Sequence, residues 1–174
     1  MLNIAQIGVG YWGPNLLRNL VANKKCEVTR VAELSEERRE YVKRLYPAVE
    51  TTRDVDRVLE DGRVDALVIA TPVATHFELA MKGLEAGKHV LVEKPLARTV
   101  KEVEEIGKLA RRKNRVAMVG HTFLFNAAVR YVKELIDSGG VGEVRYIYSQ
   151  RLNLGRIRSD VDELWNFAPH DTSI

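Results

Sequence analysis

A glycine-rich turn between an apolar strand and a helix constrains the fold of this chain most. Residues 2–7 are mostly apolar, and the sequence Gly-Val-Gly-Tyr-Trp-Gly follows them, with glycines at Gly8, Gly10 and Gly13. Pro14 then stands at a favourable first position of a helix. A strand, a G-x-G-x-x-G turn and a helix in this order are typical of a site for the pyrophosphate of a dinucleotide.

Each glycine of this turn has an expected structural or binding role. Gly8 permits the tight turn, Gly10 lets a pyrophosphate approach the backbone, and Gly13 lets the helix pack closely on the strand. The free N–H groups and the positive end of the helix dipole would face the phosphates. We expect Tyr11 and Trp12, which lie within the turn, to contact the cofactor as well.

An acidic residue at the expected distance strengthens this interpretation. Residues 27–32 form a second expected strand, and Glu33 follows it, at the distance from Gly13 that is typical of a ribose-binding acid. A carboxylate there would accept hydrogen bonds from the adenosine ribose hydroxyls and repel a 2′-phosphate, which predicts NAD over NADP. Arg38 lies close in sequence and would weaken this preference. The alternative is a structural turn with a solvated glutamate.

Strands and helices alternate through the first two thirds of the chain. We expect further helices at residues 36–45, 54–60, 75–86 and 99–112, and further strands at residues 48–51, 65–70, 89–92 and 116–119. Repeated strand–helix units predict an α/β fold with a doubly wound parallel sheet, the Rossmann architecture. We place the end of this dinucleotide-binding domain near Gly120, so that it spans residues 1–120.

The sequence pattern changes after Gly120. We expect a helix at residues 126–137 and, because aromatic and β-branched residues favour strands, a long strand at residues 143–152. Residues 121–174 would then be the beginning of an incomplete α+β domain. An unpaired strand edge needs a partner, so we expect a homo-oligomer built through residues after Gly120.

Composition argues against several other classes of protein. The net charge is only +3, and the basic run at residues 111–115 has no interleaved aromatic residues, which argues against nucleic-acid binding. The single Cys26 excludes an internal disulfide. We expect a cytoplasmic protein, because we find neither a signal peptide nor an apolar run of membrane-spanning length. No Cys/His cluster has the spacing of a zinc site, so no metal is expected.

Ligands of open parallel sheets bind beyond the carboxyl ends of the strands, and three groups of polar residues are expected there. They are Thr71 and Pro72 with His76, then Glu93, Lys94 and Pro95, and finally His121. His76 would contact the cofactor or cap its helix. Lys94, beside a positively charged nicotinamide, could exchange a proton with a substrate hydroxyl. A solvated charged turn at Lys94 fits the spacing equally well.

These motifs, in this order, resemble those of the Gfo/Idh/MocA family, the NAD(P)-dependent sugar dehydrogenases that include glucose–fructose oxidoreductase and inositol dehydrogenase. The resemblance implies that Lys94 is catalytic beside the nicotinamide and that His170 lies at the sugar carbon being oxidised. The family has an aspartate four residues before that histidine. Asn166 replaces it here, so an anionic partner is missing.

Within the family, residues 10–15 and 151–155 are most similar to the nucleotide-sugar 3-dehydrogenases. This similarity implies oxidation at C3 of a UDP-N-acetylhexosamine, with Asn153 and Asn166 in the substrate site. Family members use their second domain for substrate binding and subunit contact, which residues 121–174 would begin. We therefore predict an NAD-dependent oxidoreductase acting on a sugar or nucleotide sugar. The alternatives are a non-catalytic dinucleotide-binding module and a purely structural assembly domain.

Overall fold

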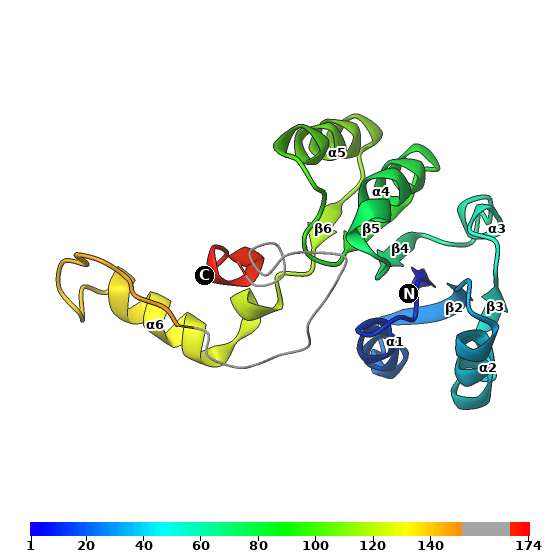
Figure 1. Cartoon of the computed structure of the whole chain (residues 1–174), viewed down its shortest axis with the longest axis horizontal. Coiled ribbons are helices and arrows are strands. Elements are labelled where there is room, and N and C mark those ends of the chain that lie inside the picture. Colours follow the sequence, from blue (N-terminus) through cyan, green and yellow to red (C-terminus); the bar gives the residue numbers. More distant parts are fainter. Residues whose placement is uncertain (151–167) are drawn as a thin grey trace. The chain divides into compact units, whose positions relative to one another are not determined.

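The computed structural model describes residues 1–150 and 168–174, and the chain divides into two compact units, Met1–Gly120 and His121–Ile174. The first unit contains a six-stranded parallel sheet with the order β3-β2-β1-β4-β5-β6 (Figure 1). Its strands are β1 (Leu2–Ile7), β2 (Cys26–Ala32), β3 (Glu50–Thr52), β4 (Ala66–Ile69), β5 (His89–Val92) and β6 (Ala117–Val119). The strand order reverses direction at β1, as the predicted doubly wound fold requires.

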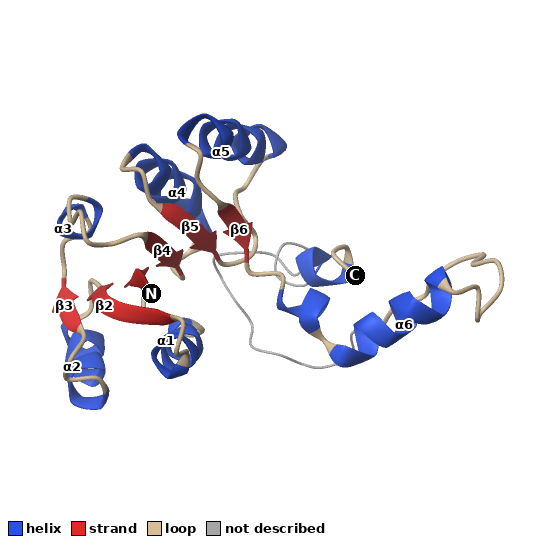
Figure 2. Ribbon diagram, turned by 180° about the vertical axis from the view of Figure 1, so that it is seen from behind, coloured by secondary structure: helices blue, strands red, loops and turns tan. Residues whose placement is uncertain are grey.

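Helices cover both faces of this sheet. They are α1 (Gly13–Ala22), α2 (Glu36–Leu45), α3 (Asp56–Leu59), the short 3-10 helix η1 (Val73–Thr75), α4 (His76–Glu85) and α5 (Val100–Lys113). Helices α1 and α2 lie on one face, and α3, α4 and α5 lie on the other (Figures 1 and 2). Two buried apolar clusters correspond to these faces. Leu17 and Val42 belong to the first, and Leu67 and Leu84 belong to the second.

Local capping explains where two of the helices begin. The Ser35 hydroxyl accepts a hydrogen bond from the backbone of Arg38 at 3.4 Å, at the start of α2. Helix α5 begins with a full capping box, because the Glu102 carboxylate also accepts the backbone N–H of Thr99 at 3.0 Å. Helix α5 ends at Asn114, which adopts the left-handed conformation with φ of 53°.

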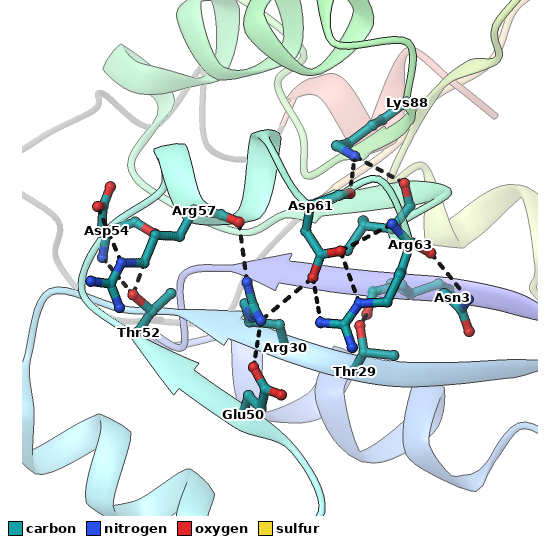
Figure 3. A network of polar contacts seen from close by, with 12 residues as sticks. Asn3, Thr29, Arg30, Glu50, Thr52, Asp54, Arg57, Asp61, Arg63 and Lys88 are labelled. Atoms are coloured by element: carbon teal, nitrogen blue, oxygen red, sulfur yellow. Dashed lines mark hydrogen bonds and ion pairs between the residues drawn. The ribbon is translucent and has the colours of Figure 1, made fainter.

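A polar network closes the amino-terminal edge of the sheet, where the connection from α3 enters β4 (Figure 3). The Asp61 carboxylate pairs with Arg63 at 2.8 Å and with Arg30 at 3.4 Å, and Arg30 also pairs with Glu50. Lys88 is buried, and its ammonium donates to the carbonyls of Asp61 and Val64 at 2.7 and 3.0 Å. The charged groups of this edge are thus bonded to one another or to backbone.

The second unit contains the 3-10 helix η2 (Thr122–Phe125) and α6 (Ala127–Asp137), which is capped by the Asn126 side chain. The strand predicted at residues 143–152 is wrong for residues 143–150, which form no strand; residues 151–152 lie outside the described range. A strand needs a neighbour that pairs with its backbone groups. No described residue of this unit offers such a neighbour, so β-propensity alone does not produce one.

No helix among residues 1–150 and 168–174 is long and apolar enough to cross a membrane. The same residues contain no group of three or more His, Cys, Asp and Glu side chains arranged to hold a metal ion.

Candidate functional site

The glycine turn lies at the carboxyl end of β1, beside the point where the strand order reverses. Gly8 has φ of +90°, and a Cβ there would lie 2.7 Å from the carbonyl oxygen of Ala70. A Cβ on Gly13 would lie 2.6 Å from the carbonyl oxygen of Gly8. Backbone thus approaches both glycines so closely that no side chain fits. This geometry agrees with the packing tasks expected of these two residues.

Gly10 differs from the other two glycines because the space above it is open. Among the described residues, the only atom near a Cβ built there is Nη1 of Arg38, at 3.5 Å. The helix that follows carries no side-chain cap and no acidic residue in its first turn, and Trp12 occupies its N-cap position. A diphosphate therefore fits the residues present, since it could approach the Gly10 backbone and accept from the N–H groups of α1.

The side chain of Gln6 stabilises this turn by hydrogen bonds to its backbone. Gln6 was not among the site residues predicted from the sequence. Its side chain is fully buried, and its amide nitrogen donates to the carbonyls of Gly8 and Gly13, each at 2.9 Å. The amide thus joins the two ends of the turn. A polar residue between the apolar residues Ala5 and Ile7 at the end of β1 was the signal that could have identified it.

Glu33 lies next to the turn at the carboxyl end of β2, as predicted. One carboxylate oxygen accepts the Val9 N–H at 2.7 Å, and the other accepts the Ser35 N–H at 2.9 Å. Each oxygen retains a second lone pair with which it can accept from a ligand hydroxyl. Arg38 donates to the Val9 carbonyl at 2.6 Å, so a carboxylate and a guanidinium both meet the backbone of Val9.

The loop after β4 contains Thr71 and Pro72, which lead into η1. The Thr71 and Thr75 hydroxyls lie 2.7 Å apart, and Thr75 also donates to the Pro72 carbonyl at 2.8 Å. His76 is 1% exposed, and its ring nitrogens contact the carbonyl oxygens of Pro95 and Thr71, each at 2.8 Å. Both ring nitrogens are therefore engaged within the protein, by the loops after β4 and β5.

The loop after β5 contains Glu93, Lys94 and Pro95, and the Lys94–Pro95 peptide bond is cis. Burial raises the pKa of the half-buried Glu93 carboxyl, although a hydrogen bond from the Lys94 backbone and the charge of Lys94 oppose the shift. The Lys94 N–H lies 3.3 Å from this carboxylate.

The other predicted site residues belong to the second unit. Residues 168–171 are helical, and the half-buried His170 lies against Phe123, with ring centroids 4.9 Å apart. His121 directly follows the first unit, and its Nδ1 atom is buried without a hydrogen-bond partner among the described residues. Asn153 and Asn166 lie outside the described residues.

The match to a family model covers the first unit of the chain. Residues 2–121 match the model of the Gfo/Idh/MocA oxidoreductase family, which has an NAD-binding Rossmann fold. The uncharacterized oxidoreductase YdgJ of Escherichia coli is 33% identical over 164 residues, which cover 94% of this chain and 46% of YdgJ. The scyllo-inositol 2-dehydrogenase (NADP(+)) IolW of Bacillus subtilis is 26% identical over 136 residues, 78% of this chain and 37% of IolW.

Among solved structures, the 3-ketoreductase KijD10 of Actinomadura kijaniata, in complex with TDP-benzene and NADP, superposes with a TM-score of 0.77 at 30% identity. The match covers 83% of this chain and 44% of KijD10. This chain spans about half the length of the curated relatives it matches. On the family match and the doubly wound sheet together, the chain belongs to the Gfo/Idh/MocA family of oxidoreductases.

Proposed function

We propose that this chain is the dinucleotide-binding part of an NAD-dependent oxidoreductase that acts on a hydroxyl-bearing carbon of a sugar or nucleotide sugar. One observation carries the proposal. The open backbone at Gly10, the Glu33 carboxylate and the Glu93–Lys94 loop lie along the same carboxyl edge of one parallel sheet. Ligands of open parallel sheets bind at this edge.

The residues of this edge divide the binding of a dinucleotide among them. The pyrophosphate would lie over Gly10 and the start of α1, and the adenosine ribose would donate to Glu33. The nicotinamide would then lie toward the loops that contain Thr71 and Lys94. When bound, the nicotinamide supplies the acceptor for a hydride.

Lys94 is the proposed proton acceptor. Hydride loss from a carbon that bears a hydroxyl requires that the hydroxyl proton leave as well, and a lysine beside the reacting centre can receive it. His170 is the second candidate, because the family resemblance assigns the histidine at this position to the reacting carbon. The finer proposal is oxidation at C3 of a UDP-N-acetylhexosamine, with Asn153 and Asn166 in the substrate site.

The choice of substrate class is supported by named relatives. IolW is named for a cyclic polyol, and KijD10 is a ketoreductase whose structure holds TDP-benzene, a thymidine diphosphate derivative. Both names also mention NADP, whereas Glu33 favours NAD in this chain. The proposed preference therefore depends on whether the carboxylate of Glu33 or the guanidinium of Arg38 dominates at the ribose.

The experiment that tests this function combines binding and turnover. Calorimetry with NAD comes first, followed by cofactor-reduction assays with UDP-N-acetylglucosamine, its uronate and simple polyols. Turnover should disappear in Lys94→Ala and persist in Lys101→Ala, an exposed lysine on α5 that serves as a matched control. Absence of NAD binding would refute the proposal. Unchanged turnover in Lys94→Ala would refute the assignment of Lys94.

We also infer a homo-oligomer that forms through residues after Gly120. Tyr131, Val132, Tyr146 and Tyr148 expose 53–84% of their surface in the described part of the second unit. Exposed apolar side chains of this number favour association with another chain. Light scattering that shows a monomer at high protein concentration would contradict this inference.

A further inference from the structure

The side-chain amide of Gln6 connects the start of the glycine turn to the start of α1. Gln6 is fully buried, and its Nε2 atom donates to the carbonyl oxygens of Gly8, which follows β1, and of Gly13, the first residue of α1. The opposite orientation of the amide would place its oxygen against two carbonyl oxygens, so the chemistry of these contacts identifies the donor atom. A Cβ on Gly13 would lie 3.1 Å from the same nitrogen, so the helix begins in contact with the amide.

The peptide between Gly8 and Val9 is held on both of its sides. Its carbonyl accepts from Gln6, and its N–H, which belongs to Val9, donates to the Glu33 carboxylate at 2.7 Å. In a trans peptide the C=O and N–H bonds point in opposite directions. Gln6 and Glu33 therefore act from opposite sides and together oppose rotation of this peptide plane.

The next peptide, between Val9 and Gly10, is held by its carbonyl. The Val9 carbonyl accepts from Nη1 of Arg38 at 2.6 Å. The N–H of this peptide belongs to Gly10, and it points away from Arg38 because the peptide is trans. The direction of the Gly10 N–H thus depends on Arg38 and on the preceding peptide, which Gln6 and Glu33 hold.

We propose that Gln6 is a positioning residue for the pyrophosphate, because its amide keeps the Gly10 N–H and the N–H groups at the start of α1 directed at one anion. The proposal rests on the proposed binding of NAD. Several N–H groups bind an anion well when their directions are fixed beforehand, since binding then does not have to order them. Without the amide, the buried carbonyls of Gly8 and Gly13 lose a donor, and the turn can shift relative to the helix.

This role concerns the diphosphate of the cofactor and not its adenosine. The adenosine ribose is assigned to Glu33, and one oxygen of that carboxylate is also held by the Ser35 N–H at 2.9 Å, independently of Gln6. The diphosphate is assigned to the turn and the start of α1. Loss of the Gln6 amide should therefore weaken the binding of ligands that contain a diphosphate and leave the binding of adenosine unchanged.

Gln6→Met tests this separation, because methionine has a similar length and carries no donor. Calorimetry should show affinities for NAD and for ADP about tenfold weaker than in the wild type. The affinity for adenosine, measured by NMR titration, should change by less than about twofold. Equal weakening of all three ligands, or an unchanged affinity for ADP, would overturn the proposal. Absence of NAD binding in the wild type would instead refute the proposed function.

Ile4→Ala is the matched control for this variant. Ile4 is buried earlier in the same strand, and its backbone pairs with Val28 and Ala66. Its substitution should lower the temperature of thermal unfolding and leave the affinities for NAD, ADP and adenosine unchanged. A loss of ADP affinity as large as that in Gln6→Met would show that any damage to β1 weakens the site, and would overturn the assignment to Gln6.

A measurement on the wild type tests the proposal even if Gln6→Met does not fold. The chain has two glutamines, so ¹⁵N-glutamine labelling allows the Gln6 amide to be followed beside that of the exposed Gln150. Local opening of the turn lets the Gln6 amide exchange its hydrogens with water. At equal saturation of the site, ADP should slow this exchange and adenosine should not, because only ADP requires the closed turn. Equal exchange rates with the two ligands would overturn the proposal.

Discussion

The pKa of a carboxyl group is shifted in opposite directions at the two edges of the parallel sheet, at Asp61 and at Glu93. At the amino-terminal edge, hydrogen bonds from Arg63 hold the pKa of Asp61 well below its usual range, and the nearby charges of Arg63 and Arg30 add to this shift. At the carboxyl edge, burial raises the pKa of Glu93. The amino-terminal edge thus favours the charged form of Asp61, whereas burial at the carboxyl edge disfavours the charged form of Glu93. Perturbed carboxyls of this second kind are typical of ligand sites.

The largest expected effect is at the carboxyl edge of the sheet, where the backbone at Gly10 is open. Gly10→Val should abolish measurable NAD binding, because the side chain would occupy the space proposed for the pyrophosphate. The free energy of unfolding should change by about 1 kcal/mol or less, since, among the described residues, only the end of the flexible Arg38 side chain lies within 4 Å of a Cβ at this position. Calorimetry and urea unfolding measure the two quantities. Normal NAD binding by this variant would place the cofactor elsewhere.

Gly8→Val is the comparison for that variant. At Gly8 a side chain meets the Ala70 carbonyl and an unfavourable φ, so this variant should lose folding rather than binding alone.

The next largest effect is expected at the amino-terminal edge of the sheet, in the polar network around Asp61. Lys88→Met removes the buried ammonium that donates hydrogen bonds to the carbonyls of Asp61 and Val64. The free energy of unfolding should fall by about 2–3 kcal/mol, whereas NAD affinity should not change. Lys82→Met, at an exposed pair with Glu78, is the control and should leave the free energy of unfolding nearly unchanged. A large loss of NAD affinity in Lys88→Met would mean that the two edges are coupled.

A smaller effect concerns the choice of cofactor. Glu33→Gln keeps an acceptor for the Val9 or Ser35 N–H but removes the negative charge that repels a 2′-phosphate. The ratio of NADP to NAD affinity should rise roughly tenfold, and Arg38→Ala should lower it. Calorimetry with both cofactors gives the ratio. Equal or tighter binding of NADP by the wild type would contradict the predicted preference.

The smallest effects should have opposite signs at the two edges. Asp61→Asn should destabilise the protein at neutral pH, because a carboxylate with a lowered folded pKa contributes stability that is lost as pH falls below its ordinary value of 3.8. Glu93 has a raised folded pKa, so its penalty is present at neutral pH and is relieved as pH falls through that pKa. Glu93→Gln should therefore stabilise the protein at neutral pH.

Thermal unfolding of both variants between about pH 3 and about pH 7 measures these signs. Destabilisation of both variants at neutral pH would remove the distinction between the edges.

Local signals in the sequence predicted most of the first unit. Apolar runs located the strands, and the side chains of Ser35 and Thr99 marked the starts of α2 and α5. The doubly wound sheet followed from the alternation of these elements. The prediction failed at residues 143–150, because a strand depends on a partner that propensity does not reveal.

The sequence was less informative about contacts within the candidate site. It selected Glu33, Lys94 and the glycines, but it could not show that the Glu33 carboxylate accepts the Val9 N–H, which lies far away along the chain. It also placed His76 near the cofactor without indicating that both ring nitrogens are used by backbone carbonyls. Such contacts depend on tertiary packing, for which these residues carry no local signal.

The position of β1 in the sheet also determines when a binding site can exist during folding. Ile4 pairs with Val28, in the next strand along the chain, and with Ala66, which is much more distant in sequence. The second pairing closes a much longer loop and is expected to be the slower step. The glycine turn and the loop after β4 come together only in that step. A ligand that binds between them therefore cannot assist the earlier pairing of β1 with β2. Binding of such a ligand during refolding would show that β1 and β4 have paired.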